Sequence, residues 1–147
     1  MASLQKLTDL VGIPGGINVG VSAARQTTML TLLGNPRSDY NTHCQDVENP
    51  SLRRFVAFES VGPFRVRGLK PAVDSLRQIL EVAAMEAAPL HDALGSAGMF
   101  CARLVPGSTT SISNHSWGTA VDLTVGRHAH RRAQLEARRD VHAVPAV

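Results

Sequence analysis

The stretch Ser113-Asn114-His115-Ser116-Trp117-Gly118-Thr119-Ala120-Val121-Asp122 carries most of the information in this chain. It places an imidazole and a carboxylate seven positions apart. Zinc accepts imidazole nitrogen and carboxylate oxygen at about 2.0–2.2 Å, and a catalytic zinc site takes three protein ligands and keeps one position open for water. His115 and Asp122 are therefore a candidate pair of zinc ligands. The alternative is a short turn in which the two side chains only hydrogen-bond to each other.

Residues 119–125 are expected to form a strand that brings these two side chains together. Side chains alternate across a pleated strand, so Asp122 would point away from the face that carries the apolar residues. Gly118 supplies a flexible step before the strand. The His115 ring is thus predicted to fold back toward Asp122, with the metal-facing atoms about 3–4 Å apart, as two ligands of one tetrahedral zinc require. The apolar face would hold Val121, Leu123 and Val125.

The motif resembles that of a known enzyme family. The pattern Ser-x-His-x-x-Gly-x-Ala-x-Asp, filled by Ser113, His115, Gly118, Ala120 and Asp122, closely resembles the first metal motif of the D-alanyl-D-alanine carboxypeptidase family of zinc peptidases. That family includes vancomycin-resistance dipeptidases and phage or bacterial enzymes that cut peptidoglycan stem peptides. The resemblance continues upstream and covers roughly residues 26–125. It implies an α+β fold in which a small mixed sheet packs against helices, as an incomplete zinc peptidase core.

The resemblance also implies roles for individual residues. Zinc would be held by His115 and Asp122, and Ser113 would orient the histidine, although a serine in such a loop also satisfies its own backbone. Arg103 would hold the scissile carbonyl or a substrate carboxylate. It lies in residues 99–105, which are expected to form a strand beside residues 119–125, with Arg103 on the face of Asp122. A structural salt bridge is the alternative for this guanidinium, which is costly to bury without a partner.

One element of the family pattern is missing from this sequence. In the family, a Glu-x-x-His element supplies the third zinc ligand and the general base. No histidine of the chain has a glutamate three positions before it: the residues there are Tyr40, Ala88, Ile112, Val125, Arg127 and Arg139. We therefore expect a zinc-dependent peptidoglycan peptidase-like domain that is truncated and weakly active or inactive as this chain. A non-catalytic remnant that binds cell-wall peptides is the alternative.

Length and charge divide the chain into three parts. With 147 residues and 44% hydrophobic content it is expected to hold one core, residues 26–125, between a flexible arm, 1–25, and a basic helical or disordered tail, 126–147. The tail holds five arginines against two acidic residues and so accounts for the net charge of +3. A nucleic-acid partner is therefore not favoured for the core, although the tail itself suits an anionic surface. His128 or His130 of the tail are possible substitute zinc ligands.

Location and cysteine chemistry are only weakly constrained. The first ten residues lack the apolar run of a signal peptide, and no segment approaches the roughly 20 apolar residues of a membrane span. A peptidoglycan stem peptide as partner would then require export or cell lysis. Cys44 and Cys101 permit one disulfide, but buried free thiols are the favoured interpretation. The sequence leaves the oligomeric state open.

Periodicity predicts the remaining elements. A short helix is expected over residues 23–33, a polar surface loop over 35–50, and one or two strands over 54–66 with a break at Gly62-Pro63. The clearest helix begins near Pro71 and ends at Pro89, and a further helical turn follows to Leu94. Its buried stripe would consist of Val73, Leu76, Leu80 and Ala83. Trp117, the sole tryptophan, is expected to pack and fix the histidine loop rather than bind substrate.

Overall fold

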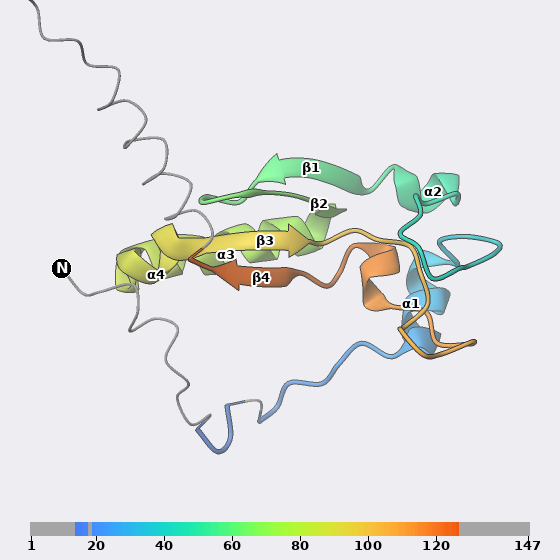
Figure 1. The fold of residues 1–147 in the computed structure, drawn as a ribbon, viewed down its shortest axis with the longest axis horizontal. Helices are drawn as coiled ribbons and strands as arrows, with labels where there is room; N and C mark the ends of the chain where they lie inside the picture. The colour runs from blue at the N-terminus through green and yellow to red at the C-terminus, as the bar shows by residue number, and fades with distance from the viewer. Residues whose placement is uncertain (1–13, 18, 127–147) are drawn as a thin grey trace, which may run out of the picture.

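The chain adopts a small α+β fold, which confirms the expected class. The computed structural model describes residues 14–17 and 19–126. Their strands form two separate two-stranded antiparallel sheets rather than one mixed sheet. Figure 1 shows the strands side by side in the order β1, β2, β3, β4, with helix α3 running along them. Within the described residues no helix combines the length and the apolar character that a membrane span needs.

The first sheet is a hairpin. β1 (Val56–Ser60) and β2 (Arg65–Leu69) pair in antiparallel register, with Phe58 opposite Arg67. The chain turns at Gly62, whose φ of 118° is a conformation that glycine adopts at little cost. The predicted strands and their break at Gly62-Pro63 are therefore confirmed.

Helix α3 (Lys70–Glu86) begins directly after β2 and ends before a shorter helix, α4 (Ala88–Ala93). Pro71 lies in its first turn, where the missing N–H leaves no hydrogen bond unmade. The predicted stripe is buried at all but its last position, where Ala83 is half-buried. With apolar residues of both sheets the stripe forms the first core cluster: Val61, Phe64, Val66, Val73, Leu76, Leu80, Leu94 and Met99.

The second sheet differs from the expectation. β4 (Asp122–Val125) pairs with β3 (Leu94–Gly98), which begins at Leu94, where the predicted helical turn ends, and was not predicted as a strand. The predicted strand over residues 99–105 is wrong, because this segment forms only isolated bridges, from Ala102 to Gln45 and from Leu104 to Ile112. Met99 belongs to the first core cluster and Phe100 packs against a second one, so apolar residues of this segment are buried without a hydrogen-bonded ladder.

A second core cluster lies at one end of the sheets. Here α1 (Gln26–Leu33) meets the short 3-10 helix η2 (Asn114–Trp117), and α2 (Pro50–Arg53) contributes Leu52. Trp117 is completely buried in this cluster, and its indole Nε1 donates to the carbonyl of Gly34, 2.9 Å away. Trp117 therefore fixes the histidine turn by packing, as expected.

The apolar face predicted for residues 119–125 is only partly buried. Val121 packs against the first core cluster, whereas the side chains of Leu123 and Val125 are 49% and 38% exposed. Asp122 is exposed, as its alternation predicts. The strand thus presents its carboxylate to solvent, but its apolar side lacks a complete cover among the described residues.

Candidate metal centre

His115 sits on a tightly closed turn. Ser113 begins η2, and its hydroxyl accepts a hydrogen bond from the His115 amide at 3.4 Å. Gly118 ends the helix in the left-handed conformation, with φ of 69°. A Cβ at Gly118 would lie 2.7 Å from the amide nitrogen of Leu69, so only glycine lets the turn approach β2 this closely. The short helix therefore holds the histidine at a fixed place beside the first sheet.

The orientation of the His115 ring follows from one backbone contact. Its Nδ1 lies 2.9 Å from the carbonyl oxygen of Met99. A carbonyl only accepts hydrogen bonds, so Nδ1 carries the proton in the neutral ring and Nε2 keeps its lone pair. A backbone carbonyl on one ring nitrogen is the usual outer partner of a histidine that binds metal through the other. The ring is thus prepared to act as a ligand through Nε2.

Asp122 completes the pair. Its Oδ2 lies 3.6 Å from Nε2 of His115, within the range predicted for two ligands of one zinc ion. The imidazole is largely buried, with 14% of the side chain exposed, whereas the carboxylate is 63% exposed. Asp122 is positioned by β4, where it pairs with Gly98 just beyond an irregularity in the register. A buried nitrogen and an accessible oxygen therefore converge from two elements at the surface.

Among the described residues, the pair has no third candidate ligand beside it. Across residues 14–17 and 19–126, no group of three or more His, Cys, Asp or Glu side chains is arranged to hold a metal ion. His128 and His130, the possible substitute ligands, lie outside the described residues, as does the predicted tail apart from Gly126. The described part of the chain therefore offers two candidate zinc ligands.

Ser113 contacts the backbone of the histidine and not its ring. Its hydroxyl caps η2, which is the backbone role that the sequence left open for it. Met99 orients the ring through its carbonyl. Ser116, which the sequence analysis did not single out, is completely buried, and its hydroxyl donates to the carbonyl of Arg103 and accepts from the amide of Arg103, both at 3.0 Å.

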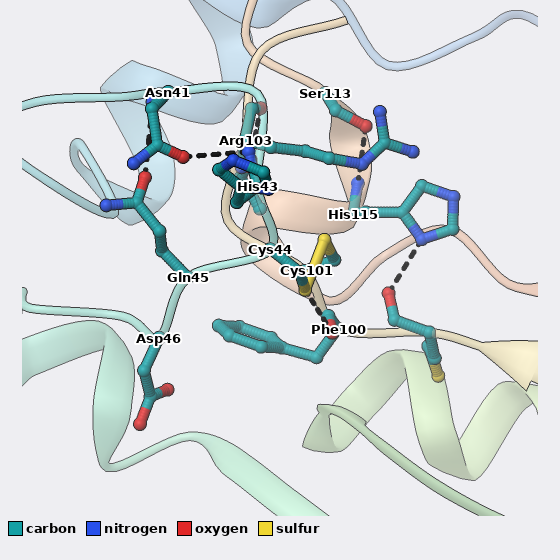
Figure 2. The surroundings of a disulfide bond; sticks show 12 residues. Asn41, His43, Cys44, Gln45, Asp46, Phe100, Cys101, Arg103, Ser113 and His115 are labelled. Carbon is teal, nitrogen blue, oxygen red and sulfur yellow. Dashed lines mark hydrogen bonds between the residues drawn. A yellow bond between two sulfur atoms is a disulfide. The ribbon is translucent and has the colours of Figure 1, made fainter. Parts of the chain in front are cut away.

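Arg103 therefore lies next to the histidine turn, but backbone hydrogen bonds place it there instead of the predicted strand pairing. The expected pairing of residues 99–105 with residues 119–125 is wrong, because β4 pairs with β3. Arg103 instead reaches η2 through its backbone, since its carbonyl also accepts from the Ser113 amide at 3.1 Å. Its half-buried side chain donates to the carbonyl of Leu104 at 3.3 Å, and in Figure 2 it extends toward the region of Ser113 and His115.

A cleft lies between β2 and β3. It has a volume of about 250 Å³ and is lined by residues 65–67 and 96–100. Arg65 stacks over the Phe58 ring at 4.3 Å, and Arg67 stacks over Phe100 at 4.7 Å. Because Met99 lines the cleft and its carbonyl binds the His115 ring, the cleft adjoins the candidate metal pair. The alternating arginines of Arg65-Val66-Arg67 are the sequence signal for this cleft, which was not among the predicted features.

Arg67 also forms an ion pair that joins the cleft to the preceding loop. Its Nη2 lies 2.7 Å from Oδ1 of Asp46. Slight burial raises the pKa of Asp46, but the hydrogen bonds from Arg67 and from the Val47 amide outweigh this effect and hold the pKa below its usual range. Asp46 therefore stays ionised at neutral pH. In the salt bridges formed among the described residues, Arg65 takes no part, so its charge remains available at the cleft.

The cysteines form a disulfide, and the expectation of buried free thiols is wrong. Cys44 and Cys101 are bonded to each other with their Cα atoms 5.0 Å apart, a normal separation for a disulfide. Cys44 is exposed and Cys101 is half-buried. Figure 2 shows the bond between the loop that carries His43 and the segment that leads to Arg103. The 57 residues between the cysteines made this proximity impossible to infer from spacing.

The chain was compared with protein-family models, curated proteins and solved structures. No family model matches the chain, and neither the curated proteins nor the solved structures contain a match.

Proposed function

We propose that this chain is a zinc-dependent, peptidoglycan peptidase-like domain of the D-alanyl-D-alanine carboxypeptidase type, with weak or no turnover of its own. The observation that carries the proposal is the His115–Asp122 pair. A histidine whose Nδ1 is bound by the Met99 carbonyl presents Nε2 at 3.6 Å from a carboxylate oxygen. An imidazole nitrogen and a carboxylate oxygen are donors that zinc accepts, and this tautomer leaves Nε2 free to bind it, which supports the proposal.

The residues fit part of a zinc site. His115 would bind the metal through Nε2 and Asp122 through a carboxylate oxygen. When bound at a catalytic site, zinc lowers the pKa of its water to about 7 and polarises the peptide carbonyl. With two protein ligands, most of the coordination would remain to water, so the affinity is expected to be low.

Turnover is limited by the missing base. A positioned carboxylate that takes the proton of the attacking water contributes roughly 10²–10⁴-fold to the rate. The sequence places no glutamate at the Glu-x-x-His spacing. The chain would therefore bind and orient a peptide better than it cleaves one.

The cleft between β2 and β3 suits a peptide that carries carboxylates. Arg65 and Arg67 line this cleft, and guanidinium recognises carboxylate through paired hydrogen bonds. A peptidoglycan stem peptide is the proposed ligand. Arg103 remains the residue that the family resemblance assigns to the carbonyl or carboxylate, and variants of Arg65 and Arg103 will show which guanidinium binds the peptide.

The disulfide agrees with a substrate outside the cytoplasm. Disulfides persist in secreted and periplasmic proteins and are reduced in most cytosols. The Cys44–Cys101 bond is therefore consistent with work on the cell wall after export or lysis.

A non-catalytic cell-wall peptide-binding module is the second candidate function. The absence of the Glu-x-x-His pattern from the sequence favours it. Both candidates predict binding of stem peptides to the arginine-lined cleft. Only the first predicts that zinc is needed for cleavage of the peptide. Metal-dependent cleavage by a longer chain that carries a Glu-x-x-His element would support the peptidase over the binding module.

The deciding experiment is a zinc titration with matched variants. We expect weak binding by the native chain, and loss of binding in His115→Ala and Asp122→Asn. His91→Ala is the control, because His91 also contacts a carboxylate, with its Nδ1 3.0 Å from Asp92, but lies on α4. Equal zinc affinity in the native chain and in His115→Ala would contradict the proposal.

Incubation with muropeptides tests the catalytic part. We expect no useful cleavage by the native chain. Metal-dependent turnover that disappears in His115→Ala would contradict the claim of weak activity. If the double variant His128→Ala/His130→Ala also lost that turnover, the tail would be part of the active site.

A further inference from the structure

The segment that orients His115 lies outside the regular strands. Residues 99–105 belong to neither sheet and form only two isolated bridges. This segment nevertheless contacts the histidine turn at several points. The Met99 carbonyl binds the His115 ring, the Cys101 amide donates to the His115 carbonyl at 2.9 Å, and the Arg103 carbonyl accepts from Ser113. The position of the candidate ligand therefore depends on where residues 99–103 lie.

The disulfide is the covalent restraint on this segment. It joins Cys101, in the middle of residues 99–103, to Cys44 on the preceding loop. The neighbouring bridge between Gln45 and Ala102, with both hydrogen bonds at 3.1 Å, continues the same contact. Figure 2 shows the disulfide between the loop and the histidine, with the Cys44 side of the bond on the exposed loop. A reductant in solution can therefore reach the bond.

We propose that the Cys44–Cys101 disulfide is a redox switch for the His115–Asp122 site, an inference that rests on the proposed zinc function. A dithiol reductant supplies two electrons and two protons: the S–S bond breaks, Cys44 and Cys101 become thiols, and the dithiol is oxidised to its own disulfide. The loop then separates from residues 99–103, and the Met99 carbonyl no longer holds the His115 ring in place. The site therefore binds zinc more tightly in an oxidising environment than in a reducing one.

The expected change in zinc affinity follows from the loss of the Met99 carbonyl as the group that orients His115. Loss of an outer partner that orients a metal-binding histidine typically weakens metal affinity by about 10–100-fold. We expect reduction to weaken zinc binding by about tenfold or more through this route. A domain made in a reducing cytoplasm would then bind its metal more tightly after reaching an oxidising environment.

The test compares three forms of the full chain: the oxidised protein, the same protein reduced by a phosphine, and the variant Cys44→Ser/Cys101→Ser. Zinc affinity is measured for each form, and amide hydrogen exchange is measured without metal. The informative amides are those of residues 101 and 113, which bond to His115 and Arg103, and the reference amide is that of Val61, which donates to Phe64 in the hairpin turn. Thr42→Ala, on the same loop but with the disulfide intact, is the control variant.

Weaker zinc binding in both forms that lack the disulfide, with faster exchange at residues 101 and 113 and unchanged exchange at Val61, is the expected result. Equal affinity and equal exchange in all forms would overturn the switch. Equal acceleration at Val61 would also overturn it, because the effect would then be global unfolding. If the oxidised protein binds no zinc while exchange at residues 101 and 113 still accelerates on reduction, the proposed zinc function fails and the coupling of the disulfide to the turn stands.

Discussion

His115 is positioned by its backbone and by its ring at the same time. The Ser113 hydroxyl and the Cys101 amide hold its backbone, while the Met99 carbonyl holds its ring. A ligand that is restrained in this way loses little freedom when a metal binds. The single histidine therefore depends on contacts from two segments that are separate in sequence.

Gly118 is predicted to be the least replaceable residue of the turn. Gly118→Ala places a Cβ 2.7 Å from the Leu69 nitrogen and keeps φ at 69°, so we expect a loss well above the roughly 1 kcal/mol of the backbone conformation alone. Urea unfolding measures the loss. Gly107→Ala is the matched control, because its φ is 83° and its Cβ would meet nothing within 4 Å. Equal losses in the two variants would show that the close approach to β2 contributes nothing.

For single residues, the sequence predicted which side chains form the candidate site, but not the groups that bond to them. The convergence of His115 and Asp122 could be foreseen because both lie in one short motif with strand alternation. The Met99 carbonyl could not be foreseen, because every residue carries a carbonyl and only the fold selects one. The disulfide was missed for a similar reason, since two cysteines give no information about their distance in space.

Among the elements, the long helix and the hairpin were the most predictable. Both have strong local signals: α3 has an apolar stripe with Pro71 at its start, and the hairpin has Gly62-Pro63 at its turn. β3 was not foreseen because its sequence, Leu-Gly-Ser-Ala-Gly, has weak strand propensity. Its pairing with β4 is a long-range contact that neither segment indicates alone.

The disulfide is expected to stabilise the fold as well as the site. Closing a loop over a sequence separation of 57 residues restricts the unfolded chain, so Cys44→Ser/Cys101→Ser should lower the free energy of unfolding by about 2–4 kcal/mol. Urea unfolding without reductant measures this change, with Thr42→Ala as the control. A loss below about 0.5 kcal/mol, the range of ordinary surface substitutions, would contradict the expectation.

A charged network between β1 and α3 predicts acid sensitivity. Asp74 accepts hydrogen bonds from Lys70 and Arg77, and Arg77 also pairs with Glu59. The hydrogen bond from Lys70 is the main reason that the pKa of Asp74 lies below its usual range. Because the folded pKa is below the unfolded one, the stabilisation is present above the unfolded pKa of about 3.9 and is lost as the pH falls through the folded pKa.

Thermal unfolding between pH 7 and pH 3 tests this network. We expect the melting temperature to fall on acidification and to fall less in Asp74→Asn, which removes the titrating group. High salt should reduce the difference, since these side chains are partly exposed to solvent. The same acid dependence in the native chain and in Asp74→Asn would show that other carboxylates are responsible.

In the whole molecule, the candidate site lies where β4, η2 and residues 99–103 meet. β4 provides the carboxylate, η2 provides the imidazole, and residues 99–103 connect the site to the disulfide and to the cleft. The sequence predicted the α+β class because it depends on element types, but not the split into two sheets, which depends on pairing. The zinc function and the stem-peptide ligand rest on the motif and on this geometry, and they remain proposals.

The most direct test of the account is nitrogen-15 NMR of the histidine rings during a zinc titration of the oxidised chain. Before zinc is added, the His115 ring should be the tautomer with its proton on Nδ1, because that atom donates to Met99. Zinc should then shift the Nε2 signal of His115 and leave the signals of His91 unchanged. A proton on Nε2 in the metal-free protein, or zinc binding that leaves the His115 signals unmoved, would contradict the central claim that this pair is a metal site.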